Sequence, residues 1–314
     1  MVSFRFHLIS LIAVFLALGI GITVGATVVD KATVSALESR LSTVDKRVDE
    51  ANQRSDTLDS DVRRWRTFGD QAASILVQSR LTGIPVLLVA IRGTDNGAVT
   101  KLRDLLISAG AKFEGTVWLT SKMALDPKKP EDAASLADAL DAHVVGPDTL
   151  RQVALSRLSV AWAAGGPDVP LAALRSAGFI DYDAPPGGPV PDLAVLPVPA
   201  TRFVVASQST ADVPNELLAG PFTAELAKAA SRRVVAVEPG SDAAPGKLAD
   251  RAAFVGLLRA DNQIGPLVST VDDLEDLRGQ VAAVLAVADL GSGRLGNYGV
   301  GAKATRLVPD VTAP

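Results

Sequence analysis

Three patterns of apolar spacing follow one another along this chain. Residues Leu8 to Val29 (LISLIAVFLALGIGITVGATVV) carry no charge over 22 positions. At about 1.5 Å per helical residue, such a run is long enough to cross a hydrocarbon core of roughly 30 Å. The pattern predicts a short N-terminal tail and a single transmembrane helix over residues 1–29. A secretory signal cleaved after Ala26 is the alternative, because Val24, Gly25 and Ala26 are small enough for a cleavage site.

Small residues recur at every fourth position of this apolar run. Ala17, Gly21 and Gly25 form a ladder that lets two membrane helices approach closely. Arg5 precedes the run, whereas Lys31 follows it with further basic residues beyond. Long folded regions cross membranes largely regardless of charge. We therefore expect the N-terminus inside the cell and the bulk of the chain outside the cytoplasm.

A second pattern, with apolar residues at alternating spacings of three and four, follows from Val34. This is a heptad seam held for about six repeats, and it predicts a parallel coiled-coil stalk over residues 30–80 that joins two copies into a homodimer. The flanking positions would pair Arg40 with Asp45, Arg54 with Asp59, and Asp61 with Arg66 across the coil, all of opposite charge. The alternative is a long helix folded back on its own domain. The seam residues are Val34, Leu37, Leu41, Val44, Val48, Ala51, Leu58, Val62 and Trp65.

Short apolar runs alternate with helical patterns from residue 81 to the end. Strands are predicted at Val86–Ile91, Phe113–Leu119, Arg202–Ser207 and Arg232–Glu238. Helices are predicted at Val99–Ala109, Glu131–Ala142, Asp148–Ala163, Pro170–Ala177, Phe222–Ala230, Lys247–Arg259 and Leu274–Leu290. This alternation predicts a mostly parallel, Rossmann-like α/β head over residues 81–314. The proline- and glycine-rich stretch 184–191 leaves open whether the head is one sheet or two similar halves.

Composition removes several classes of function. The 314 residues include no Cys, two His and two Met, so disulfides, thiolate metal sites and Cys nucleophiles are excluded. A net charge of −4 argues against nucleic acid as a partner. Three Trp and two Tyr are too few for the aromatic girdles of a membrane β-barrel.

The candidate chemical motifs all have simpler structural interpretations. Gly291 to Gly296 matches GxGxxG but lacks the following helix and strand, which favours a glycine-rich loop. Asp95 ends a strand and is expected to be a turn or helix N-cap. Asp272, Asp273, Glu275 and Asp276 suggest a cation cluster, but acidic residues also favour the first turn of a helix.

The two histidines offer little support for a site. His143 has no second His, Cys or Met near it in the sequence, and His7 adjoins the membrane run. A Ser-His-Asp triad would need one of them, and no GxSxG elbow is present. We therefore predict no enzyme activity and assign no catalytic, metal-binding or cofactor-binding residues.

Four segments together resemble a known family. They are FHLISLIAVFLALGIGITVGAT near the N-terminus, the adjoining heptads, VSTVDD from Val268 to Asp273, and GNYGVGAKATRLVP from Gly296 to Pro309. They are similar to the actinobacterial copper transport outer membrane protein family, also called mycobacterial copper transport protein B. The resemblance implies a cell-envelope protein of a mycolate-type or related actinobacterium, assigned to copper efflux and to an outer-membrane channel.

The residues by themselves favour a different interpretation. Copper prefers thiolate, thioether and imidazole ligands, and the chain offers Met1, Met123, His7 and His143. One membrane helix makes a pore only if many copies assemble. The competing hypothesis is a dimeric, membrane-anchored scaffold whose head recruits or regulates a division or cell-wall-remodelling partner, a role to which members of the family have also been linked. The chain itself predicts an inner-membrane anchor, whereas the family name implies the outer membrane.

Overall fold

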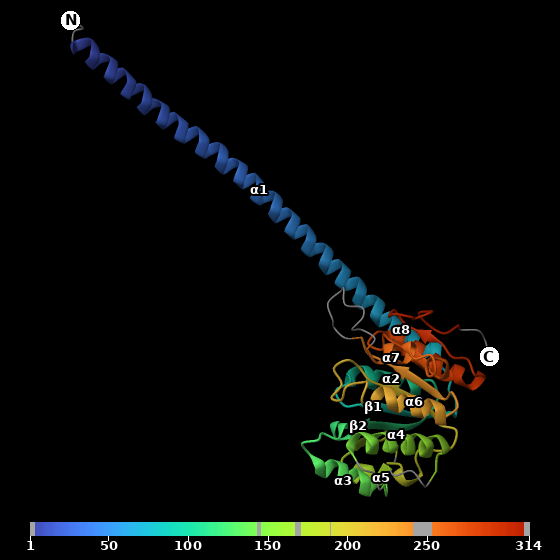
Figure 1. Ribbon diagram of the computed structural model, residues 1–314. Helices are drawn as coiled ribbons and strands as arrows, with labels where there is room; N and C mark the ends of the chain where they lie inside the picture. The colour runs from blue at the N-terminus through green and yellow to red at the C-terminus, as the bar shows by residue number, and fades with distance from the viewer. Residues whose placement is uncertain (1–3, 143–145, 167–170, 189, 241–252, 311–314) are drawn as a thin grey trace. The chain divides into compact units, whose positions relative to one another are not determined.

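The computed structural model describes residues 4–142, 146–166, 171–188, 190–240 and 253–310. The chain divides into two compact units, Met1–Thr67 and Phe68–Pro314. The first unit is part of one helix, and the second contains a β-sheet with helices around it (Figure 1).

Helix α1 runs without a break from Phe4 to Val77. Its Arg5–Gly25 segment has a mean hydropathy of 2.5 and no buried residue, and it is long and apolar enough to cross a membrane. The large apolar seam residues from Val34 to Trp65 are also exposed, with exposed fractions between 46% and 72%. The described part of the predicted membrane segment and the whole seam from Val34 to Trp65 are therefore helical. The predicted pairing of the seam concerns a second copy and stays a prediction.

The second unit is organised around one seven-stranded sheet. Its strands are β1 (Pro85–Ile91), β2 (Lys112–Leu119), β3 (Ile180–Asp183), β4 (Arg202–Ala206), β5 (Val234–Val237), β6 (Ser269–Val271) and β7 (Asn297–Tyr298). Their order is β3-β2-β1-β4-β5-β6-β7. Only β3 is antiparallel to its neighbour. A mostly parallel α/β fold is confirmed, and all seven strands belong to one sheet.

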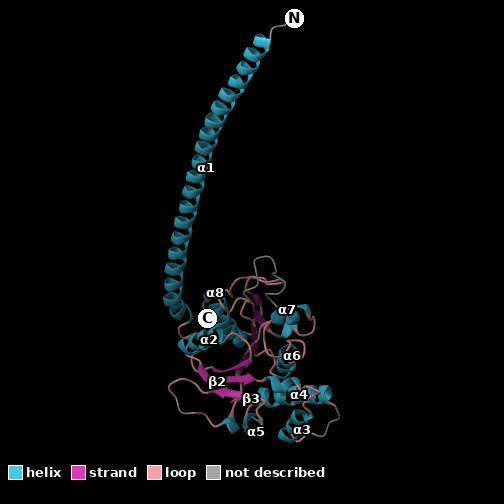
Figure 2. Ribbon diagram, turned by 90° about the vertical axis from the view of Figure 1, so that its left-hand side faces the viewer, coloured by secondary structure: helices cyan, strands magenta, loops and turns pink. Residues whose placement is uncertain are grey.

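Helices cover both faces of this sheet. They are α2 (Asn96–Ser108), α3 (Pro130–Ala139), α4 (Pro147–Ala164), α5 (Leu171–Ser176), α6 (Ala219–Ala229), α7 (Ala253–Ala260) and α8 (Leu277–Asp289). Short 3₁₀ turns lie at Ser121–Ala124, Leu193–Val195, Gly265–Leu267 and Leu290–Ser292. In Figure 2 the magenta strands lie between α2 and α8 on one side and α4, α6 and α7 on the other.

The strands alternate between two separate cores, as pleated backbones require. Leu87, Val89 and Ile91 of β1 face the core that includes α4, α6 and α7, where Trp162 packs against Phe222. The intervening residues of β1 face the core formed with α2, α8 and the end of α1. Because β1 is buried on both faces, its sequence PVLLVAI is wholly apolar.

Two crossover connections have opposite hand. Helices α2 and α8 cover the same face of the sheet, yet β1-α2-β2 and β6-α8-β7 advance toward opposite edges. Parallel crossovers are right-handed in the great majority of proteins, so one of these two is an exception. Strand β7 is short and follows one of these two crossovers, so we expect interactions beyond the strand pairing itself to hold it beside β6.

Candidate functional site

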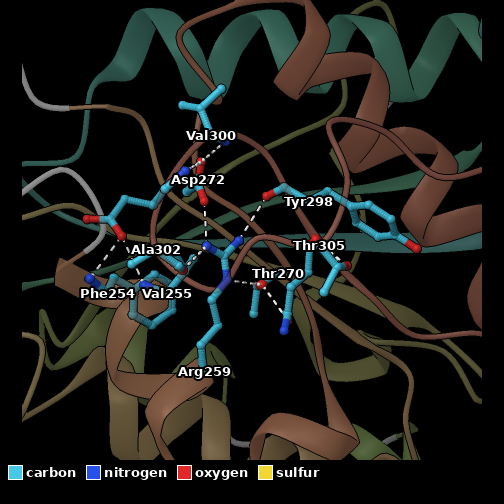
Figure 3. Close-up of polar contacts among 12 residues, drawn as sticks. Phe254, Val255, Arg259, Thr270, Asp272, Tyr298, Val300, Ala302 and Thr305 are labelled. Atoms are coloured by element: carbon cyan, nitrogen blue, oxygen red, sulfur yellow. Dashed lines mark hydrogen bonds and ion pairs between the residues drawn. The ribbon is translucent and has the colours of Figure 1, made fainter. Parts of the chain in front are cut away.

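The carboxyl edge of β5, β6 and β7 carries the densest buried polar network among the described residues (Figure 3). Glu238 directly follows β5 and is 1% exposed. Its Oε2 accepts hydrogen bonds from the backbone N–H groups of Phe254 and Val255, both at 2.9 Å. These are N–H groups of the first turn of α7, which have no partner within the helix itself. Glu238 thus fixes the start of α7 against the end of β5.

Arg259, near the end of α7, is the centre of this network. Its Nε donates to Thr270 Oγ1 at 2.7 Å, and its Nη1 forms an ion pair with Asp272 Oδ2 at 2.5 Å. Nη1 and Nη2 also donate to the backbone carbonyls of Ala302 and Tyr298, at 3.0 and 2.8 Å. The Arg259 side chain is fully buried. The planar guanidinium suits this arrangement because it presents several donors in a fixed fork.

Asp272 completes the network from the end of β6. Its Oδ1 accepts from the backbone N–H groups of Val300 and Gly301, at 2.7 and 2.9 Å. A Cβ at Gly299 would lie 2.2 Å from the same Oδ1, and Gly299 has a φ of +115°. Glycine at this position therefore lets the backbone approach the carboxylate closely.

The network joins the two C-terminal segments that carry the family resemblance. Thr270 and Asp272 belong to the segment VSTVDD. The segment GNYGVGAKATRLVP provides the backbone carbonyls that accept from Arg259 and the backbone N–H groups that donate to Asp272. Asn297 Oδ1 also accepts from Thr270 Oγ1 at 2.9 Å. Sequence reasoning missed this site because its ion pair joins residues 13 positions apart on different elements. The arrangement braces β7 and the loop that follows it, and its main donors are occupied within the chain.

The acidic run after β6 differs from its sequence interpretation. Helix α8 begins at Leu277 rather than Leu274, because the Asp276 side chain caps it by accepting from the N–H of Arg278. Of the four acidic residues, only Asp276 therefore stands at the helix end. Asp272 belongs to the buried ion pair, and Glu275 accepts from the backbone N–H of Gly240. Asp273 is 2% exposed, and neither of its carboxylate oxygens has a hydrogen-bond partner among the residues that the structure describes.

Burial shifts the proton affinity of two acids at this edge. Loss of hydration raises the pKa of Glu238 to about 8, although the backbone N–H groups that it accepts from oppose the shift. Loss of hydration, followed by the charges of Asp272 and Glu275, raises the pKa of Asp273 to about 7. Both directions follow from the cost of placing a charge away from water. Two acids with near-neutral pKa values therefore lie close to the Arg259 network.

A second polar group lies where β1 and β4 are adjacent and their connections lead in opposite directions, a position at which open α/β sheets commonly bind ligands. Asp95 caps α2 by accepting from Gly97 and Ala98, which confirms the N-cap prediction. Gln208 crosses the gap between the strands: its Oε1 accepts from Asp95 N at 3.1 Å and its Nε2 donates to Gly93 O at 2.8 Å. The chain thus uses these groups to join its own loops.

The predicted seam and membrane residues all belong to α1. The small residues Ala17, Gly21 and Gly25 are exposed. A Cβ at Gly21 or Gly25 would meet no atom within 4 Å. Asp61, predicted to pair with Arg66 of a second copy, forms an ion pair with Arg64 of its own helix.

Of the possible metal ligands, the structure describes His7, on α1, and Met123. Met123 is fully buried in the core, and His143 lies outside the described residues, as does Met1. Within the part of the chain that the structure describes, no three His, Asp or Glu side chains are placed to hold a metal ion. The Gly291–Gly296 motif spans the end of a 3₁₀ turn and the loop before β7, with no strand directly before it. It is the glycine-rich loop expected from the sequence.

Comparison with known proteins gives matches over nearly the whole chain. The family described as Copper transport outer membrane protein, MctB, matches residues 1–309. Proteins named Copper transporter MctB from Mycobacterium bovis and Mycobacterium tuberculosis are 27% identical over 319 residues, covering 96% of this chain and 97% of theirs. The protein of that name from Mycobacterium leprae is 26% identical over 325 residues, covering 98% of this chain and 99% of its own. The chain belongs to the MctB family of copper transport outer membrane proteins.

Proposed function

We propose that this chain is a membrane-anchored protein of the cell envelope that acts in copper homeostasis. The match of the family over residues 1–309 is the observation that carries the proposal. The apolar Arg5–Gly25 helix supports a membrane location. The mycobacterial relatives are named copper transporters, so copper is the cargo that we propose.

The proposal assigns copper binding to no residue in the core of the chain. Met123 has the soft thioether that copper favours, but its side chain is fully buried among apolar groups. A conducting path formed by this chain would need several copies, because one helix cannot enclose a pore. Assembly of copies is therefore part of the proposed role.

The proposed assembly is a parallel homodimer formed through the seam of α1. The large seam residues, Val34 and Trp65 among them, are about half exposed or more, as expected for positions that a second helix covers. Arg40 and Asp45, and likewise Arg54 and Asp59, would meet across a parallel pair with opposite charges. Exposed pairs of this kind specify register and orientation more than they add stability.

The exposed seam also favours a second candidate function, a non-enzymatic scaffold. In this alternative the dimer presents its α/β heads to a division or cell-wall-remodelling partner, and the effect on copper is indirect. The absence of a metal-holding cluster among the described residues is consistent with it. The two functions share the membrane helix and the dimer, so they must be separated in cells.

The test compares a deletion strain of the source organism with strains that regain the chain. Cell copper is measured by mass spectrometry after copper exposure, and cell separation is scored by microscopy. The copper function predicts that the wild-type chain lowers cell copper and that Val48→Asp, which places a charge in the seam, does not. Gln53→Asp adds the same charge to the outer side of the helix and should behave as wild type.

The outcomes separate the proposals. Unchanged cell copper after deletion contradicts the copper function. Abnormal separation in that same strain, restored by Gln53→Asp but not by Val48→Asp, would support the scaffold. If Val48→Asp loses the dimer but still restores the wild-type level of cell copper, the seam is not needed for the copper function.

A further inference from the structure

Asp272 and Asp273 are adjacent acids with opposite surroundings. Asp272 faces Arg259 and accepts two backbone N–H groups. Asp273 is equally buried, at 2% exposed, but both of its carboxylate oxygens are buried without a hydrogen-bond partner among the described residues. An ionised carboxylate in such a place is strongly disfavoured, whereas a protonated one costs much less to bury. The geometry alone therefore favours a proton on Asp273.

The environment of Asp273 is mostly negative. Among the described residues, Asp272, Glu275 and Asp276 all repel its ionised form, and Arg278 attracts it. Arg278 is itself held by Asp276, at 3.0 Å from Nε to Oδ1, and about half of its side chain is exposed. Arg259, on α7, is committed to Asp272. Among these described residues, the negative charges around Asp273 therefore outweigh the one positive charge that attracts it.

The carboxylate also lies in a tight place between β6 and α8. A Cβ at Gly279 would lie 2.6 Å from Asp273 Oδ1 and 2.0 Å from its backbone oxygen. The next residue, Leu274, donates its backbone N–H to the carbonyl of Glu238 at 3.1 Å, which ties the loop to the end of β5. Hydration of an ionised Asp273 would therefore require this loop to move away from the first turn of α8.

We infer that Asp273 is a proton-binding site that controls the packing of the β6–α8 loop. When Asp273 holds its proton, the loop packs as described against α8 and the end of β5. When the proton leaves, repulsion from Asp272, Glu275 and Asp276 and the demand for water loosen the loop. Because Asp272 also holds Val300 and Gly301, the loosening extends to the segment after β7.

The direction of the pH effect follows from the shift. The pKa of Asp273 is about 7, above its ordinary value of 3.8, so the folded state binds the proton more tightly than the unfolded state does. Stability then falls as pH rises between these two values and stays low above the upper one. Glu238, with a pKa of about 8, acts in the same direction over a slightly wider range.

The test uses the full chain in detergent micelles, with wild type and Asp273→Asn compared from pH 5 to pH 8.5. Asparagine keeps the shape of the protonated acid and cannot ionise. We expect Asp273→Asn to unfold above the wild type already at pH 5, because that pH exceeds the unfolded value of 3.8, and its advantage to grow by roughly 5 °C between pH 5 and pH 8. Amide hydrogen exchange at residues 272–276 and 296–302 should quicken with pH in the wild type, beyond the intrinsic rate, and not in the variant.

Glu114 provides the matched control. It is 4% exposed, but its carboxylate accepts from Val198 N at 3.1 Å and Thr201 Oγ1 at 2.9 Å. Burial also raises the pKa of Glu114, although these two hydrogen bonds oppose the shift. An amide has only one accepting oxygen, so Glu114→Gln gives up one of these bonds and should gain less stability than Asp273→Asn at pH 8. The inference is overturned if Asp273→Asn unfolds at or below the wild-type temperature at pH 8, or if the wild-type exchange at residues 272–276 does not respond to pH.

Discussion

Helix α1 and strand β1 contain the same kinds of apolar residues in opposite surroundings. Every residue from Val86 to Ile91 in β1 is fully buried, whereas Leu41 and Val48 of α1 are half exposed or more. The apolar side chains of the sheet are buried within one chain, because helices cover both of its faces. In the unit that contains the seam of α1, no described residue covers the seam.

The difference shows that periodicity predicts which residues need a partner surface but not where that surface comes from. Burying a Val or Leu side chain contributes about 1.5–3 kcal/mol relative to leaving it exposed. The head gains this contribution when it folds, and the seam would gain it only on association. Damage to the head should therefore change folding without changing association, and damage to the seam should do the reverse.

The largest expected effect comes from breaking the head at Arg259. Arg259→Ala leaves the buried Asp272 charge without its partner, and breaking such a pair costs about 3–5 kcal/mol. The midpoint of thermal unfolding of the head should fall by roughly 6–20 °C, followed by circular dichroism. Arg278→Ala is the control, since it removes an exposed ion pair with Asp276 and should cost about 1 kcal/mol or less. Equal losses in the two variants would contradict the bracing role of Arg259.

A smaller effect is expected from breaking the seam at Val48. Val48→Asp would bury a charge from each copy, and we expect the dimer dissociation constant to rise about 100-fold, or about 3 kcal/mol. Sedimentation of the full chain in micelles measures it. Gln53→Asp should leave the constant unchanged, and the head should unfold at the same temperature in both variants. A wild-type chain that sediments as a monomer would contradict the seam.

The fold was largely predictable from the chain because its central strands are buried on both faces. PVLLVAI of β1 and the apolar run of β4 leave little choice of structure, and both strands are found as predicted. The missed strands, β3, β6 and β7, lack this signal. Strand β6 contains only Ser269, Thr270 and Val271, and β7 contains two residues that side chains from α7 and β6 hold in place. Long-range polar contacts of this kind leave no periodic pattern.

The polar site was less predictable than the fold. Asp272 and Asp273 look alike in the sequence, yet one is paired and the other is not. Which of them meets Arg259 depends on the register of β6 against β7 and on the start of α8 at Leu277. By contrast, the role of Asp95 follows from three adjacent residues, and there the prediction was confirmed.

That local cap provides a further test of the head. Asp95→Ala removes the side chain that accepts from Gly97 and Ala98 at the start of α2. The loss of an N-cap costs about 1 kcal/mol, so the unfolding midpoint should fall by roughly 2–4 °C. Asp104→Ala, at an exposed position within the same helix, should change stability by about 0.5 kcal/mol or less. A fall as large as that of Arg259→Ala would show that Asp95 does more than cap the helix.

The smallest effect is expected at Met123, and it bears on copper. Leucine fills nearly the same volume as methionine and usually costs less than about 1.5 kcal/mol in a core. Because Met123 is fully buried against apolar side chains, Met123→Leu should leave the copper content of complemented cells at the wild-type level. The head should also unfold at nearly the wild-type temperature. A rise in cell copper with an unchanged unfolding temperature would mean that the core opens to expose the Met123 thioether. The contrast between the buried residues of the head and the exposed seam of α1 would then not hold at Met123.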